Sequence, residues 1–290
     1  MHPRRTPLIV ANWKMHKTVS EAEAFIDDLL PRIPATDAIE VVICPAYLAL
    51  RPAADRTRGS RVKVHAQNMH YAAEGPFTGE VSAPMLVEAG VTGVILGHSE
   101  RRRLFAESDW AVQLKTAAAV AARMVPIVCV GETEEECELR ETEARICEQV
   151  RTALALVDTS RLGEVVIAYE PIWTLGTGRV ATPAHVQEVG SLVRGVVANR
   201  SPEQAIRARV LYAGGVLPEN ARMLLEVDDI DGLLVGEASL DVDSFTAIID
   251  SACRGGRPPW PPAQSDPART ATTFVNRRRL PTGAPRSRLS

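Results

Sequence analysis

The sequence predicts an α/β fold in which eight parallel strands close into a (β/α)8 barrel. Short apolar runs alternate with amphipathic stretches at a spacing of roughly 30 residues, and repeated βα units of this kind imply a parallel sheet. The apolar runs lie at residues 7–11, 40–44, 62–66, 93–96, 125–130, 164–169, 209–213 and 231–236. Eight strands are the number that closes such a barrel. A doubly wound open sheet is the alternative architecture, but no G-x-G-x-x-G follows an early strand, so a dinucleotide site is not indicated.

Amphipathic stretches between the strands predict the helices that cover the barrel. The clearest are residues 20–30, 134–156 and 183–199. In the last of these, Thr182 has the position of a helix cap and Pro183 that of the first helical residue, where proline is favoured.

Length and charge divide the chain into two parts. Its 290 residues, 46% apolar and 24% charged, suit one globular domain of about 250 residues, which we assign to residues 1–253. Residues 254–290 hold eight Arg against one Asp, so they carry about +7 and leave about −10 on the barrel domain. This Pro/Arg-rich tail has no apolar periodicity and is predicted to be disordered. A basic tail can also contact nucleic acid or anionic lipid, but neither is a predicted partner.

The composition also bears on the compartment. No apolar run is long enough to cross a membrane, and residues 8–11 are too short for the core of a signal peptide. The five cysteines contain neither a C-x-x-C pair nor the density of a disulfide framework, so we expect a reducing cytoplasm and no metal site. They are Cys44, Cys129, Cys137, Cys147 and Cys253.

A carboxylate ends the sixth apolar run, and a loop that is stiff in front and glycine-rich behind follows it. Residues 168–179 have the sequence AYEPIWTLGTGR. Because α/β barrels place their chemistry at the carboxyl ends of the strands, Glu170 is a candidate base. Pro171 fixes one backbone angle, whereas Gly176 and Gly178 leave the far end free to swing and present bare N–H groups to an anion. The pattern predicts a base with a lid that closes over a bound phosphate.

Two further candidate side chains also lie just beyond the carboxyl ends of predicted strands. Lys14, within ANWKM at residues 11–15, places an ammonium group where a phosphorylated substrate would lie. His98, within GHSERR at residues 97–102, precedes the first turn of a predicted helix, whose partial positive charge disfavours imidazolium. A neutral imidazole there can donate a hydrogen bond to a developing oxyanion.

Two strand-to-glycine-to-helix turns occur late in the chain. YAGGV at residues 212–216 and GLLVGEASL at residues 232–240 have the form of the phosphate site that barrels build after strands seven and eight. The expected phosphate donors are the backbone N–H groups of Gly176, Gly215, Gly236 and Glu237.

In combination, these segments resemble the triosephosphate isomerase family, over residues 7–252. The resemblance implies a TIM barrel that interconverts dihydroxyacetone phosphate and glyceraldehyde 3-phosphate without a redox cofactor or a metal. It implies that Glu170 removes a proton next to the carbonyl, that His98 polarises that carbonyl, and that Lys14 stabilises the enediolate and helps to bind phosphate. These roles are the family's own, in which a carboxylate base works beside a neutral histidine.

The resemblance assigns supporting positions as well. Asn12 orients Lys14 and belongs to the substrate-binding residues. Glu100 and Arg101 support the catalytic groups, and Cys129 packs behind Glu170. The family also places the loop after the third strand, here residues 67–80, against a second subunit, with Thr78 reaching the partner's site. A homodimer is expected by this analogy. The sequence itself shows only that the loop is longer than the usual βα connection, which commonly marks a functional loop.

Four positions depart from the family pattern. Gly215 stands where Ser is usual, Ala213 where Gly is usual, and Arg179 where the lid commonly has Lys. Glu237 replaces a second Gly and puts a potential negative charge beside a dianion. These changes keep open an isomerase of another small phosphosugar, such as a tetrulose phosphate (erythrulose phosphate).

A non-catalytic binding barrel that uses the basic tail is the third interpretation. Asn12, Lys14, His98 and Glu170 are all intact. They argue against it, because a pure binding protein has no need of a base.

Overall fold

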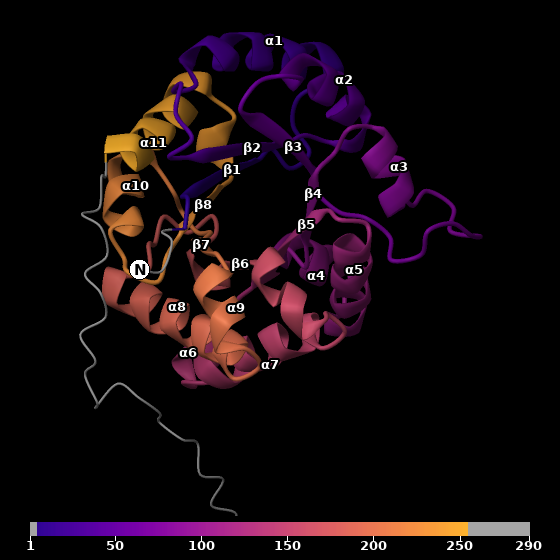
Figure 1. The fold of residues 1–290 in the computed structure, drawn as a ribbon. Helices are drawn as coiled ribbons and strands as arrows, with labels where there is room; N and C mark the ends of the chain where they lie inside the picture. The colour runs from indigo at the N-terminus through magenta and orange to yellow at the C-terminus, as the bar shows by residue number, and fades with distance from the viewer. Residues whose placement is uncertain (1–4, 255–290) are drawn as a thin grey trace, which may run out of the picture. The chain divides into compact units, whose positions relative to one another are not determined.

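The computed structural model describes residues 5–254, in which eight parallel strands close into a barrel (Figure 1). The strands hydrogen-bond to one another in chain order, and the last returns to the first. They are β1 (Leu8–Asn12), β2 (Glu40–Cys44), β3 (Val62–Ala66), β4 (Gly93–Leu96), β5 (Val125–Val130), β6 (Val166–Tyr169), β7 (Val210–Tyr212) and β8 (Gly232–Val235). The predicted barrel is therefore confirmed, and the open doubly wound sheet is excluded.

Helices surround the barrel on its outside (Figure 1). The α-helices are α1 (Val19–Leu29), α2 (Tyr47–Thr57), α3 (Ala83–Glu88), α4 (Ser99–Phe105), α5 (Asp109–Ala121), α6 (Glu134–Glu138), α7 (Thr142–Leu154), α8 (Pro183–Ala198), α9 (Pro202–Arg207), α10 (Pro218–Leu225) and α11 (Val242–Arg254). Short 3-10 turns are η1 (Leu30–Arg32), η2 (Thr159–Glu164), η3 (Ile172–Thr174) and η4 (Glu237–Ser239). Two of these, η3 and η4, follow β6 and β8 and belong to the rim where the predicted site lies.

The helix predictions differ from the structure in one place. The Thr182 side chain accepts a hydrogen bond from the backbone of His185, and Pro183 opens α8, as expected. The stretch at residues 134–156, by contrast, forms two helices, α6 and α7. Arg140 interrupts it because its φ of 61° lies in the left-handed region, which cannot continue a right-handed helix.

Alternate residues along each strand face either the barrel interior or the surrounding helices. One cluster of buried side chains fills the interior: Leu8, Val10, Val42, Cys44, Ile95, Ile127, Cys129, Val166, Ala168, Leu211, Ala213 and Leu234. The other, larger cluster packs the opposite strand faces against the helices. Because the interior is filled, a ligand has to bind at a rim, on the loops that follow the strands.

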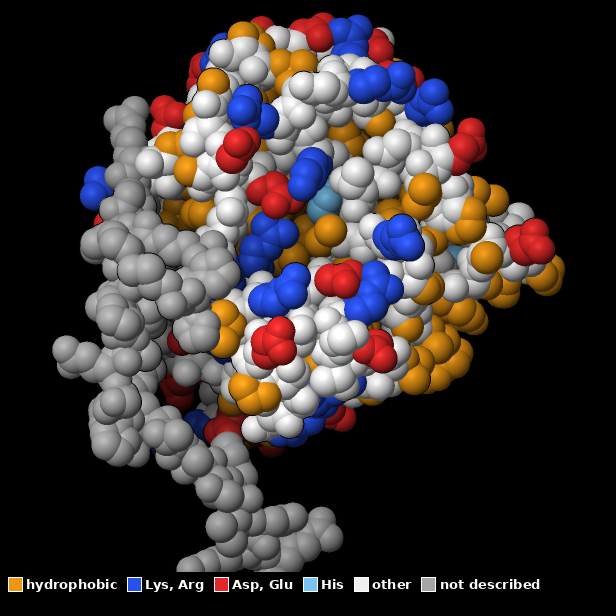
Figure 2. Space-filling view, viewed as in Figure 1, with side chains coloured by type: hydrophobic (Ala, Val, Ile, Leu, Met, Phe, Trp, Pro, Cys, Tyr) orange, Lys and Arg blue, Asp and Glu red, His pale blue; other side chains and the backbone are white. Residues whose placement is uncertain are grey.

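The described part ends with α11 at Arg254, and the predicted tail beyond it lies outside the described residues. Within residues 5–254, no helix is long and apolar enough to span a membrane. All five cysteines are free thiols. In Figure 2 the basic and acidic side chains are interspersed over the face shown, so that face presents no patch of one sign.

Candidate active site

The predicted site residues come from loops at one rim of the barrel. Asn12 ends β1, His98 follows β4, Glu170 directly follows β6, and Gly236 follows β8. The parallel strands run in one direction, so their carboxyl ends meet at this rim. The first and last strands are neighbours there: a Cβ added to Gly236 would lie 3.6 Å from Cε of Lys14. The rim therefore brings the candidate base, imidazole and ammonium group to one opening.

Glu170 is a buried carboxylate held by two donors. Its side chain is 4% exposed, Oε1 lies 2.9 Å from Nε2 of His98, and Oε2 accepts the backbone N–H of Ser99 at 3.0 Å. Burial opposes the negative charge, but the His98 ring and the Ser99 hydrogen bond outweigh it, so the pKa of Glu170 lies below its ordinary value. The carboxylate is thus ionised at neutral pH, the form that a base requires.

His98 lies at the N-terminus of α4, the predicted position, and its side chain caps the helix. Its Nδ1 accepts the backbone N–H of Glu100 at 3.3 Å, which leaves Nε2 to carry the proton that faces Glu170. The expected lowering of the His98 pKa does not occur in the structure. Burial does lower it, but the adjacent carboxylate of Glu170 outweighs burial, so the pKa of His98 lies above its ordinary value. If Glu170 moves away toward a substrate, burial and the helix N-terminus both favour the neutral ring.

Lys14 is held by its neighbours in a backbone conformation that lysine rarely adopts. Its φ is 52°, in the left-handed region. The Asn12 side chain accepts the Lys14 backbone N–H at 3.1 Å, and Gln67 donates to the Lys14 carbonyl at 2.8 Å. Nζ of Lys14 lies 2.6 Å from a carboxylate oxygen of Glu100. Asn12, Glu100 and Gln67 thus all contact Lys14, and Gln67 was not among the predicted site residues.

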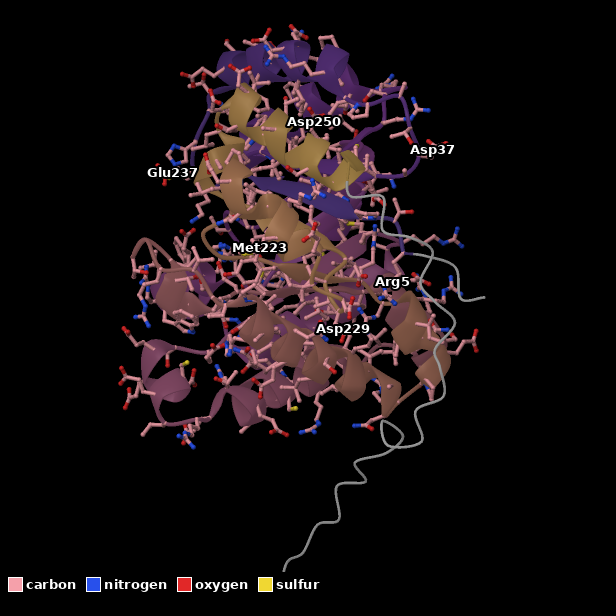
Figure 3. All side chains as sticks on the ribbon, turned by 90° about the vertical axis from the view of Figure 1, so that its left-hand side faces the viewer. Arg5, Asp37, Met223, Asp229, Glu237 and Asp250 are labelled. Atoms are coloured by element: carbon pink, nitrogen blue, oxygen red, sulfur yellow. The ribbon has the colours of Figure 1, made fainter. Side chains whose placement is uncertain are left out.

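The expected phosphate donors are unpaired in the described part of the chain. The backbone N–H groups of Gly176, Gly215, Gly236 and Glu237 donate to no acceptor within residues 5–254. Gly176 and Gly215 have φ values of 69° and 55°, which glycine adopts without strain. The side chain of Glu237 is exposed to solvent, and Figure 3 shows it at the opposite end of the barrel from Arg5.

The lid is anchored at both ends, and its glycines are exposed. At its front, Nε1 of Trp173 donates to the buried Glu132 at 2.8 Å, and the same oxygen accepts the hydroxyl of Tyr169 at 2.9 Å. At its back, Arg179 pairs with Glu134 and lies over the Trp173 ring, 4.9 Å from its centroid. Glu132 was not among the predicted site residues, although it lies two residues beyond the end of β5, as His98 lies two residues beyond the end of β4.

No side-chain hydrogen bond or ion pair within residues 5–254 joins the other three predicted supporting residues to Glu170, His98 or Lys14. Arg101 pairs with the buried Glu107, with 3.4 Å between Nε and Oε1. Thr78 is exposed in the loop after β3, and its predicted contact is with the site of a second subunit. Cys129 is packed inside the barrel, where burial raises its pKa well above the ordinary value, so its thiol is no nucleophile.

Arg102 joins two of the catalytic loops, a role that its sequence position did not reveal. Nε donates to the carbonyl of Gly97 at 2.6 Å, directly before His98, and Nη2 donates to the carbonyl of Cys129 at 3.2 Å. A Cβ on Gly97 would lie 2.8 Å from the guanidinium, so glycine at this position makes room for it.

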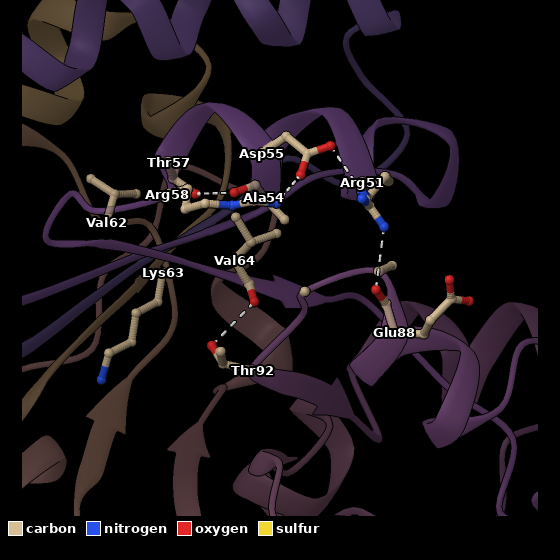
Figure 4. Close-up of a pocket in the computed structure, with 12 residues that line it drawn as sticks. Arg51, Ala54, Asp55, Thr57, Arg58, Val62, Lys63, Val64, Glu88 and Thr92 are labelled. Atoms are coloured by element: carbon tan, nitrogen blue, oxygen red, sulfur yellow. Dashed lines mark hydrogen bonds and ion pairs between the residues drawn. The ribbon is translucent and has the colours of Figure 1, made fainter.

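A cavity of about 290 Å³ lies elsewhere, between α2, β3 and the segment after α3 (Figure 4). It opens near the amino end of β3, whereas Glu170 follows the carboxyl end of β6. Its arginines are already engaged, because Arg51 and Arg58 both pair with Asp55. Within residues 5–254, no group of three or more His, Cys, Asp or Glu is arranged to hold a metal ion.

Comparison with known proteins gives one consistent result. Residues 7–252 match the family described as triosephosphate isomerase. The triosephosphate isomerase of Symbiobacterium thermophilum is 49% identical over 249 residues, covering 86% of this chain and 97% of that protein. That of Endomicrobium trichonymphae is 46% identical over 245 residues, covering 84% and 98%. The crystal structure of triosephosphate isomerase from Bartonella henselae, 36% identical, superposes with a TM-score of 0.77 over 85% of this chain and 98% of that one. The chain therefore belongs to the triosephosphate isomerase family.

Proposed function

We propose that this protein interconverts dihydroxyacetone phosphate and D-glyceraldehyde 3-phosphate, a step of glycolysis and gluconeogenesis, by proton transfer through an enediolate. The observation that carries the proposal is the buried carboxylate of Glu170, 2.9 Å from the Nε2 atom of His98 at the carboxyl rim. A binding protein gains nothing from burying an ionised carboxylate beside an imidazole. An isomerase needs both groups, one for the carbon-bound proton and one for the oxygen.

The base acts after a small rearrangement. Glu170 leaves the Ser99 N–H and takes a proton from the carbon beside the substrate carbonyl, so that the C–H electron pair forms the carbon–carbon double bond of the enediolate. It then returns the proton to the neighbouring carbon. One proton moves between the two carbons and one between the two oxygens. No net electron is gained or lost, so the reaction requires no electron acceptor. Closure of the lid strips water from the carboxylate, which strengthens it as a base.

His98 and Lys14 stabilise the charge that develops on oxygen. The proton on Nε2 of His98 faces the site, because Nδ1 is occupied by the N–H of Glu100. The ring donates this proton to the carbonyl oxygen as the enediolate forms, and Nε2 then takes the proton of the neighbouring hydroxyl, which restores the ring and creates the new carbonyl. The ammonium group of Lys14, held by Glu100, lies beside Gly236 and attracts both the enediolate and the phosphate.

The phosphate binds to backbone N–H groups. Those of Gly215, Gly236 and Glu237 come from the loops after β7 and β8, and that of Gly176 comes from the lid. Backbone donors survive any change of side chain, so the substitutions at positions 215 and 237 leave the number of donors unchanged. Closure of Gly176 over the phosphate holds the enediolate away from water, which protects it from losing phosphate.

A homodimer is the proposed assembly. The loop after β3 projects from the barrel (Figure 1), and hydrophobic side chains gather near it on the right of Figure 2. Exposed large apolar side chains of this region and of the loop after β1 are Met15, Leu48, Phe77, Met85, Leu104, Phe105 and Trp110. Exposed large apolar side chains of this kind support the proposal, because a contiguous apolar patch marks an interaction surface.

The loop has a defined shape in the single chain, which suits docking to a second copy. The His70 ring stacks on Tyr71 with 4.3 Å between centroids and contacts Phe77 with 4.0 Å. Gln67, at its start, is bonded to the carbonyl of Lys14. Met15, 94% exposed, directly follows Lys14, so a partner that covers Met15 also holds the catalytic lysine. Residence in the cytoplasm is proposed from the five free thiols.

A tetrulose phosphate is the second candidate substrate, favoured by the missing side chain at Gly215 and the added carboxylate of Glu237. A coupled isomerase assay over dihydroxyacetone phosphate, glyceraldehyde 3-phosphate and erythrulose phosphate tests both candidates. We expect the highest kcat/KM with a triose phosphate. A higher kcat/KM with erythrulose phosphate would show that the proposed triose substrate is wrong. The absence of turnover with all three compounds would contradict the proposed isomerase activity.

A further inference from the structure

Gln149 is a fully buried amide on α7 that reaches the loop before the catalytic base. Its residue is 2% exposed, and its side-chain oxygen accepts the backbone N–H of Gly131 at 2.8 Å. Gly131 directly follows β5, the strand that pairs with β6, where Glu170 begins the lid. The helix thus fixes the orientation of the peptide unit between Val130 and Gly131.

The other side of that peptide unit holds the backbone of Glu170. The carbonyl of Val130 accepts the N–H of Glu170 at 2.8 Å. Because a peptide unit is planar, the orientation of its N–H, set by Gln149, also sets the direction of its carbonyl. The two hydrogen bonds polarise the same amide group and strengthen each other. A chain of two bonds therefore links Gln149 to the base.

The α-carbon of Gly131 makes the second contact with Glu170. A Cβ at this position would lie 2.8 Å from the carbonyl carbon of Glu170 and closer still to its oxygen. Glycine is the residue that allows the two backbones to approach so closely. The main chain of Glu170 is thus fitted against residues 130–131 through both its N–H and its carbonyl.

We propose that Gln149 is a positioning residue for Glu170: by holding the Val130–Gly131 peptide, it places the Glu170 carboxylate between the Ser99 N–H and the substrate carbon. This inference rests on the proposed function, in which Glu170 is the base. Geometry matters here because a base displaced by a fraction of an ångström no longer meets the proton in line. Satisfying a buried N–H group is the purely structural role of the same bond, and it predicts a loss of stability alone.

The test compares two variants at position 149 in the full chain. Gln149→Met keeps the length of the side chain and removes the oxygen acceptor. We expect kcat to fall by about 10-fold, with the KM for glyceraldehyde 3-phosphate within about twofold of wild type, because the phosphate donors lie on other loops. The inhibition constant of inorganic phosphate should stay unchanged. The acid limb of the kcat/KM profile should move to higher pH, because a displaced Glu170 loses the bonds that lower its pKa.

Gln149→Glu keeps the length of the side chain and an oxygen that can accept the Gly131 N–H. It tests the proposal if the Met variant does not fold. Its kcat should remain within about threefold of wild type at a pH above the acid limb. Val150→Ala, at a fully buried neighbour on the same helix, is the matched control: it should lower the thermal midpoint and leave kcat and the pH profile unchanged.

Three outcomes would overturn the inference: wild-type kcat and pH profile in Gln149→Met, a 10-fold loss in Gln149→Glu, or an equal loss in Val150→Ala. The wild-type chain is assayed first. If it has no isomerase activity, the proposed function fails; if it is active, the variants test Gln149 alone.

Discussion

The imidazole of His65 lies directly against the α-carbon of Gly93 on the neighbouring strand. A Cβ at Gly93 would stand 2.5 Å from Nδ1 of the ring, so glycine on β4 is what admits the histidine on β3. His65 is completely buried, and neither ring nitrogen has a hydrogen-bond partner among residues 5–254. Burial lowers its pKa to about 3, although Glu40 raises it in part; Lys63 and Arg209 lower it further.

This burial predicts acid sensitivity. The unfolded chain binds a proton on His65 below a pKa of about 6.5, whereas the folded chain does not until about pH 3, so protons stabilise the unfolded state between these values. From pH 7 to pH 5, His65 should lower the free energy of unfolding by about 2 kcal/mol. His65→Met should remove this part of the decrease. Urea unfolding at pH 7 and pH 5, at one protein concentration, measures this change in the free energy of unfolding. The variant His16→Met, at an exposed histidine, is the control. An unchanged pH dependence in His65→Met would contradict the prediction.

Loss of the base should stop turnover without disturbing the fold. Glu170→Gln keeps the size of the side chain and an oxygen that can accept the N–H of Ser99, but an amide cannot take a proton from carbon. We expect kcat to fall by roughly 100-fold or more. A steady-state assay gives kcat. A thermal midpoint close to that of the wild type shows that the variant is folded. A variant that keeps near-normal turnover would remove Glu170 from the mechanism.

The carboxylate of Glu237 should have a small, salt-dependent effect on substrate binding. The side chain is exposed, so water and ions screen its repulsion of the phosphate. Glu237→Gln keeps the backbone N–H and should lower the KM for triose phosphate by no more than about twofold at 0.15 M salt, and by more at 0.01 M, where the Debye length is about 30 Å. Equal constants at both salt concentrations would show that the carboxylate does not act on the phosphate.

The projecting loop should control assembly and activity together. The intact chain should sediment as a dimer at micromolar concentration. Deletion of residues 72–78 removes the ring of Phe77 and the tip of the loop, and it should give a monomer with kcat lowered by roughly 100-fold, because Met15 and the catalytic lysine beside it lose their cover. Sedimentation of the intact chain as an active monomer would contradict this assembly. A circular dichroism spectrum like that of the wild type would show that the shortened barrel still folds.

Much of the barrel and of the site was predictable because the relevant signals are local. A buried parallel strand is a short apolar run, and its functional side chains follow its carboxyl end within two residues. Glu170 and His98 could therefore be assigned to the carboxyl rim from their positions after such runs. The division of residues 134–156 into α6 and α7 was not predictable in this way. Its cause is one backbone conformation at Arg140, which leaves the apolar periodicity on either side intact.

The sequence by itself determined the order of the strands, the rim that carries the chemistry and the types of side chain available there. Only the tertiary structure decided which groups touch. Gln149 meets Gly131, and Arg102 meets Cys129, across elements separated in the chain, because closing the barrel sets neighbouring loops side by side. The direction of the pKa shift of His98 was decided in the same way. Its helix position favours a neutral ring, but the carboxylate that folding brings to 2.9 Å reverses the shift, because Coulomb energy depends on distance in space.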